Sequence, residues 1–114
     1  MQPLPPEKHE EAEIAAGFLS AMANPKRLLI LDSLTKEELA VGALANKVGL
    51  SQSALSQHLS KLRAQNLVST RRDAQTIYYS SSSGAVMKIL GALAEIYGED
   101  NNAVEEKILV RKSA

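Results

Sequence analysis

The sequence contains no cysteine and no tryptophan among its 114 residues, and its aromatic side chains are one phenylalanine and three tyrosines. Without cysteine the chain cannot form disulfides, bind zinc through thiolates or use a thiol nucleophile. A chain of this length corresponds to one domain with a modest core. Because its apolar residues are mostly aliphatic, we expect a helical domain whose apolar surface is completed in part by a partner.

Long apolar runs and a net charge are also missing. No apolar run reaches the roughly 20 residues of a membrane span, and residues 1–13 are polar, unlike a signal peptide. We therefore expect a cytoplasmic protein with no membrane partner.

The 13 basic and 13 acidic residues balance to zero, but they are unevenly distributed. The segment Leu39–Arg72 contains basic residues and no acid, and such clustering indicates nucleic-acid binding better than the total charge does. The acids gather in Glu7–Glu13, Asp32–Glu38 and Glu95–Glu106, where they are expected to limit indiscriminate DNA binding.

The acid-free segment contains a predicted helix, Gln52–Ala64, with Ser51 as its N-cap. Leu55, Leu59 and Leu62 recur at the spacing of one apolar helix face. The opposite face carries serines, glutamines and cations, without the Glu–Lys pairs of an ordinary solvated helix. Amide and hydroxyl groups bond to base edges and cations hold phosphates, so this face is typical of DNA readout.

A predicted β-hairpin follows this helix. Gln65–Asn66 ends the helix, since asparagine tolerates the left-handed conformation of a C-cap. Leu67–Arg72 and Thr76–Ser80 have the composition of strands, and Asp73–Gln75 is a short polar turn between them. A helix followed by a hairpin with arginines near its tip is the arrangement of a winged helix-turn-helix.

The other segments predict four more helices and one weak strand. Asn24 and Pro25 suit the N-cap and the first position of a helix, and Gly49 suits the turn after one. Apolar residues are so dense from Leu28 to Leu34 that we expect Leu29 and its neighbours to be deeply buried. The predicted helices are Glu7–Ala23, Lys26–Leu34, Gly42–Val48 and Gly84–Tyr97, and Glu38–Val41 is expected to pair weakly as a third strand.

These elements give a mainly α fold with a small β-hairpin wing. Residues 1–6 hold three of the four prolines and are expected to form a disordered tail. Residues 7–97 are predicted to form the winged helix-turn-helix and dimerisation domain, and residues 98–114 a polar C-terminal tail.

Several short segments carry a resemblance to a known family. Glu38–Ala45, Gly49–Ser53, His58–Arg63 and Leu67–Val68 resemble the ArsR family of bacterial winged-helix repressors. The upstream Met22–Leu28 is similar to that family's Ala-x-Pro-x-Arg motif, and the match covers roughly residues 15–97. The resemblance implies a dimeric DNA-binding repressor.

The family's metal sites have no counterpart in this sequence. Where one family site has the pattern Glu-Leu-Cys-x-Cys, the matching ligand positions here are Ala40 and Gly42, which cannot ligate a metal. A second family site uses Asp and His on the last helix, whose only acid here is Glu95. His58 and Ser56 lie two apart on a helix and do not face each other. We therefore predict no metal, no cofactor and no catalytic residue.

The first and last predicted helices carry apolar stripes that one small winged core does not need. A symmetric dimer would cover both stripes, and the ArsR resemblance implies the same pairing; the alternative, that the stripes fold inward, stays open. Gly91 and Gly17 would allow close helix approach. The predicted interface residues are Ile14, Phe18, Met22, Ile89, Leu90, Leu93 and Tyr97.

The sequence thus predicts a homodimeric, sequence-specific regulator of transcription, a repressor, whose helix Gln52–Ala64 enters the major groove. Two alternatives stay open: a winged-helix protein-interaction module, and a repressor that responds to a small molecule. The predicted base contacts are Gln52, Ser53, Ser56 and Gln57. The predicted contacts to the DNA backbone are Lys47, Ser51, His58, Ser60, Lys61, Arg63, Arg71 and Arg72.

Overall fold

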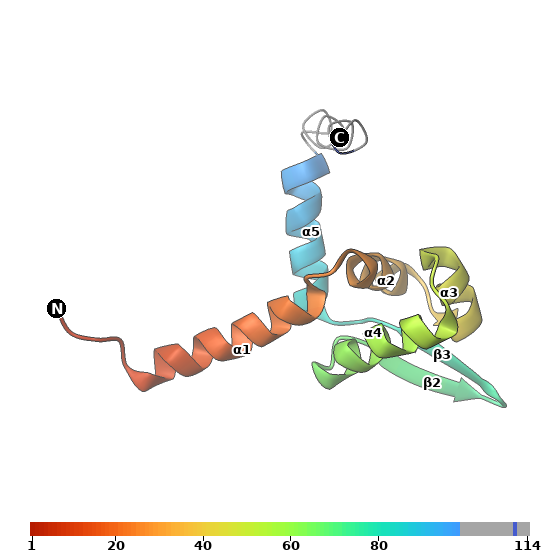
Figure 1. Ribbon diagram of the computed structural model, residues 1–114, viewed down its shortest axis with the longest axis horizontal. Coiled ribbons are helices and arrows are strands. Elements are labelled where there is room, and N and C mark those ends of the chain that lie inside the picture. Colours follow the sequence, from red (N-terminus) through yellow and green to blue (C-terminus); the bar gives the residue numbers. More distant parts are fainter. Residues whose placement is uncertain (99–110, 112–114) are drawn as a thin grey trace. The chain divides into compact units, whose positions relative to one another are not determined.

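The structure, a computed structural model, describes residues 1–98 and 111, so the predicted C-terminal tail lies almost wholly outside the described residues. The chain divides into two compact units between Ser83 and Gly84. The elements of the first unit are α1 (Pro6–Met22), α2 (Pro25–Lys36), β1 (Leu39–Ala40), α3 (Val41–Val48), α4 (Gln52–Ala64), β2 (Ser69–Asp73) and β3 (Thr76–Ser80), and the second contains α5 (Gly84–Gly98) (Figure 1). The predicted fold class is confirmed.

The start of α2 follows the predicted capping chemistry. The Asn24 side-chain oxygen accepts hydrogen bonds from the backbone amides of Lys26, at 2.9 Å, and Arg27, at 3.1 Å. Pro25 occupies the first turn, where no amide hydrogen is needed. The break between α1 and α2 is therefore fixed by local side-chain chemistry.

Burial along α2 differs from the prediction at Leu29. Ile30, Leu31 and Leu34 are buried, but the Leu29 side chain is 51% exposed. At about 100° per residue, Leu29 points well away from the direction shared by these three side chains. The expectation that Leu29 is deeply buried was wrong, because only one side of α2 faces the core.

The turn between α3 and α4 has the two predicted caps. Gly49 has a φ of 70°, in the left-handed region, and its neighbour Leu50 donates a backbone hydrogen bond to Ala45 at 2.9 Å. The Ser51 hydroxyl oxygen accepts a hydrogen bond from the Ala54 amide at 3.1 Å and begins α4. Lys26 adds a contact from α2, because its ammonium group donates to the Val48 carbonyl at 2.7 Å. These bonds set the angle at which α4 leaves α3.

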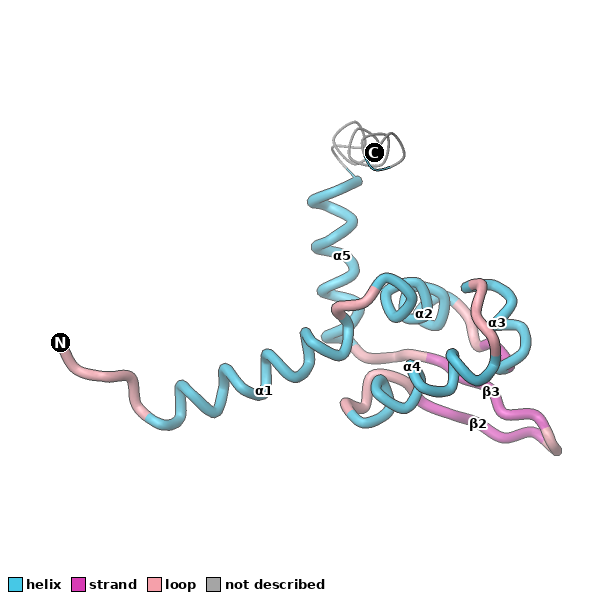
Figure 2. Tube along the Cα trace, viewed as in Figure 1, coloured by secondary structure: helices cyan, strands magenta, loops and turns pink. Residues whose placement is uncertain are grey.

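The sheet has the strand order β1–β3–β2, and both pairings are antiparallel (Figure 2). Leu39 pairs with Tyr79, so the weak third strand is confirmed. Strand β2 begins at Ser69 rather than at the predicted Leu67, because Leu67 and Val68 are buried in the core and Leu67 closes the end of α4 by donating to Leu62 at 3.0 Å.

The core of the first unit lies among α2, α3, α4 and the sheet. The predicted stripe of Leu55, Leu59 and Leu62 is fully buried, which turns the opposite face of α4 to solvent. The buried Ser81 secures the end of β3, as its hydroxyl donates to Leu67 at 2.7 Å and its amide to Leu34 at 3.0 Å. Among residues 1–98 no helix is long and apolar enough to cross a membrane.

Candidate nucleic-acid interface

The exposed face of α4 carries the four side chains that the sequence predicted to contact bases. The buried leucines hold the helix from the other side, so these polar groups point away from the core. Within the described part of the chain, their amides and hydroxyls make no side-chain hydrogen bond, and they are available to a partner. These exposed residues are Gln52, Ser53, Ser56 and Gln57.

The cations predicted to contact phosphates fall into two groups. Lys61, Arg63 and Arg72 are exposed and make no ion pair with any described residue. Lys47 and Arg71 are also exposed, but each is paired with a glutamate. The structure therefore places three unpaired and two paired cations on α3, α4 and the hairpin.

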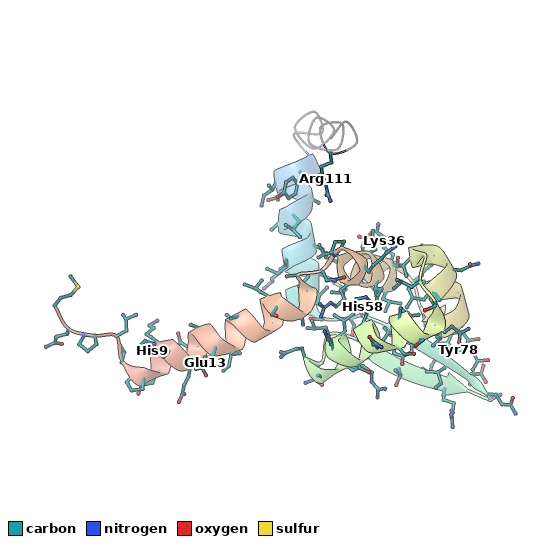
Figure 3. The ribbon with its side chains drawn as sticks, in the orientation of Figure 1. His9, Glu13, Lys36, His58, Tyr78 and Arg111 are labelled. Atoms are coloured by element: carbon teal, nitrogen blue, oxygen red, sulfur yellow. The ribbon has the colours of Figure 1, made fainter. Side chains whose placement is uncertain are left out.

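Arg71 is held by two kinds of contact. Its guanidinium donates to both carboxylate oxygens of Glu38, with Nε at 3.1 Å from each and Nη2 at 2.6 Å from Oε1. The same group lies over the ring of Tyr78, 4.6 Å from its centre. Tyr78 belongs to the neighbouring strand β3 and is labelled in Figure 3. The hydrogen bond from Arg71 lowers the pKa of Glu38, and the same bond raises the pKa of Arg71.

Arg72 is the next residue along β2 and pairs with Ile77. Successive side chains of a strand point to opposite faces, so Arg72 projects away from the side on which Glu38 holds Arg71. This alternation leaves Arg72 as the arginine of the wing that makes no ion pair with a described residue.

His58 is half-buried on α4 and lies toward α2 in Figure 3. Burial, together with the positive charges of Arg27 and Lys61, lowers the pKa of His58 below its usual value of 6.5. The lowered pKa favours the neutral imidazole, which can contact a phosphate only as a hydrogen-bond donor. Its role in DNA binding stays a prediction.

The burial of His58 predicts a pH dependence of stability. Because the pKa of His58 is lower in the folded state, protonation of His58 favours the unfolded state. The free energy of unfolding therefore has its full value above the unfolded pKa, about 6.5, and decreases as the pH falls through the folded pKa. We expect the His58→Gln variant to lose less stability than the wild type between pH 7.5 and pH 5.5. Urea unfolding at both pH values measures this, with His9→Gln on the exposed part of α1 as the control. An equal loss in wild type and His58→Gln would contradict the assignment.

An open groove of about 410 Å³ separates the C-terminal half of α1 from the flank of α4. Arg27, Lys61 and Gln65 line it, and the Arg27 Nε is buried without a partner in the described chain. A Cβ on Gly17 would lie 3.3 Å from the Gln65 amide nitrogen. The close approach at Gly17 is therefore to α4 of the same chain, whereas nothing described lies within 4 Å of a Cβ on Gly91.

Ala40 and Gly42 match the ligand positions of one metal site of the family. They lie at the end of β1 and near the start of α3. Among the described residues, no three His, Asp or Glu side chains are grouped so that they could hold a metal ion.

Glu37 and Glu38 are the site residues that the sequence did not reveal. They lie next to the acid-free segment, but their partners Lys47 and Arg71 are 10 and 33 positions away. The only available signal was the position of this acidic pair at the start of the predicted weak strand Glu38–Val41. Both pairings depend on the fold, which pairs β1 with the hairpin strand β3 and brings the connection between α2 and β1 within reach of Lys47 in the last turn of α3.

Comparison with known proteins assigns this fold and surface to a family. Residues 24–70 match the family model described as bacterial regulatory protein, arsR family. The chain is 90% identical, over 114 residues, to the nodulation protein NolR of Rhizobium meliloti, and the match covers all of this chain and 93% of that protein.

Comparison with solved structures supports the same family assignment. The crystal structure of NolR from Sinorhizobium fredii matches with a TM-score of 0.85 and 94% identity, over 86% of this chain and 98% of that one. A homodimeric winged helix-turn-helix DNA-binding domain from Mycobacterium bovis matches with a TM-score of 0.74 and 29% identity, over 88% of this chain and 93% of that one. This chain belongs to the arsR family of bacterial regulatory proteins and is a DNA-binding regulator of transcription.

Proposed function

We propose that this protein is a cytoplasmic homodimeric repressor that reads an operator in double-stranded DNA with α4. The observation that carries the proposal is the exposed, acid-free face of that helix, where four amide and hydroxyl side chains lack partners in the described chain. Gln57 lies near the middle of this face and suits a bidentate contact to an adenine edge. Repression would follow from occupation of a promoter.

Phosphate contacts would hold α4 in the groove. Lys61 and Arg63 lie in the last turns of α4, and Arg72 lies on the wing. None of them is bound to an acid in the described chain, so each is free to contact a phosphate. Such contacts fix the register of the protein on the duplex but do not read its sequence.

The proposal of a dimer rests on exposed apolar side chains in both units. On α1, Ile14 is 75% exposed, and on α5, Ile96 is 61% exposed and Leu93 is half-buried. Met22 was also predicted at the interface, but it is only 2% exposed in the single chain and has little area left for a partner. The homodimeric relative from Mycobacterium bovis supports the same assembly.

The proposed target genes follow from the relative named as a nodulation protein. At 90% identity over the whole chain, the residues that face DNA are expected to be largely shared with NolR. We therefore propose that the operators lie at nodulation and symbiosis genes.

Selection of bound duplexes from a random DNA library tests the proposal. A dimer that places two recognition helices in successive major grooves should enrich an imperfect palindrome, with half-sites about 10 bp or another whole number of helical turns apart. A pool that shows no enriched sequence would contradict sequence-specific binding and would favour the protein-interaction module.

Replacing Arg72 with alanine is expected to weaken binding to all DNA sequences. If one phosphate contact is lost, the slope of log affinity against log salt should become less steep by roughly one unit. Fluorescence anisotropy with a labelled duplex at several salt concentrations measures the slope. Lys36→Ala, which removes a cation paired with Asp32 on α2, is the control. An unchanged slope in Arg72→Ala would exclude the contact.

A further inference from the structure

Two consecutive acids, Glu37 and Glu38, each hold a cation that was predicted to contact DNA. Glu37 Oε1 lies 3.2 Å from the Lys47 ammonium, and Glu38 binds the Arg71 guanidinium through both carboxylate oxygens, the shortest distance being 2.6 Å. Both glutamates lie in the short connection that leads from α2 to β1. One dipeptide thus neutralises a cation on α3 and another on the wing.

These pairs differ from the other ion pairs of the described chain. Lys8–Glu11 and Lys36–Asp32 join residues three and four apart on one helix, as is common on solvated helices. The pairs made by Glu37 and Glu38 join separate elements. The glutamates therefore hold one cation of α3 and one cation of the hairpin, in pairs that exist only because the fold brings separate elements together.

The chemistry of both pairs allows exchange with DNA. A carboxylate that bonds to the guanidinium of Arg71 uses the same donors that a phosphate would use. Arg71 and Glu38 are 54% and 35% exposed, and Lys47 and Glu37 are about half exposed. Exposed ion pairs of this kind are weak and open readily in water.

We propose that Glu37 and Glu38 compete with DNA phosphates for Lys47 and Arg71, and so limit the affinity of this protein for DNA of any sequence. The inference rests on the proposed DNA binding. Non-specific affinity comes almost entirely from phosphate contacts, so withholding two cations reduces it directly. The unpaired Lys61, Arg63 and Arg72 supply the phosphate contacts that remain.

The double variant Glu37→Gln with Glu38→Gln tests the competition, because glutamine keeps the shape of the side chain and removes its charge. Affinity for a non-operator duplex, measured by anisotropy, should rise roughly threefold to tenfold, as expected for the loss of two weak competitors. The salt slope should steepen by up to about two units, because each released cation can neutralise one further phosphate.

The matched control is the double variant Glu11→Gln with Asp32→Asn. It changes the net charge equally and releases Lys8 and Lys36, which are not predicted to contact DNA. A second test introduces Glu38→Gln into an Arg71→Gln background, where the increase in affinity caused by Glu38→Gln should shrink to the effect of charge alone. Thermal unfolding of each variant checks that the fold is kept.

Two results would overturn the inference. If the Glu37/Glu38 variant binds no more tightly than the control, the carboxylates do not compete with phosphate. If it binds more weakly, the glutamates position the wing for DNA instead. A wild type that binds no DNA at all would refute the proposed function itself, whereas failure of the inference alone leaves wild-type operator binding intact.

Discussion

Replacing Leu93 with aspartate is expected to leave the protein monomeric or unfolded and to abolish operator binding. Leu93 is half-buried in the single chain and lies on the side of α5 that also carries Ile89 and Ile96. A carboxylate in the proposed dimer interface would be an unpaired buried charge, which costs about 3–5 kcal/mol of dimer stability. Loss of the dimer removes one of the two recognition helices, so affinity should fall well beyond the effect of any single base contact.

Sedimentation at micromolar concentration, followed by anisotropy with operator DNA, measures both effects. Lys88→Asp places the same side chain on the opposite side of α5, and this control should remain a dimer. An intact Leu93→Asp dimer would show that Leu93 lies outside the interface. A monomeric wild type would refute the dimer itself.

Replacing Gln57 with alanine is expected to remove sequence discrimination more than general affinity. The side chain is exposed near the centre of the outer face of α4 and makes no hydrogen bond in the described chain. A bidentate contact to a base is worth about 1–3 kcal/mol, so the ratio of operator to non-specific affinity should fall roughly fivefold to 150-fold.

Anisotropy with operator and scrambled duplexes gives this ratio. Gln65→Ala is the matched control, because Gln65 ends the same helix but faces Gly17 on α1. Equal losses on both duplexes in Gln57→Ala would exclude base reading by this residue and would indicate a contact to the backbone.

Local chemistry made much of the fold predictable. Asn24, Gly49 and Ser51 each act as the sequence predicted, because a cap or a left-handed turn depends on one residue and its near neighbours. The leucine stripe of α4 was equally visible, since the helical period places it on one face. Because this stripe marks the buried face, it also predicted which face of α4 is exposed.

Features that depend on tertiary structure were not predictable in the same way. Leu29 has the composition of a core residue, but the orientation of α2 exposes it. The pairing of Glu38 with Arg71 requires the fold to bring the two residues together across 33 positions. The base contacts, phosphate contacts and dimer residues depend on partners that are separate molecules, so they stay predictions.

Chemical footprinting of the protein on the duplex enriched by selection tests most directly whether two copies of α4 read DNA. Two protected regions in the major groove are expected, related by symmetry and separated by about 10 bp or another whole number of helical turns. A single protected region, or uniform protection along the duplex, would contradict DNA reading by two copies of α4.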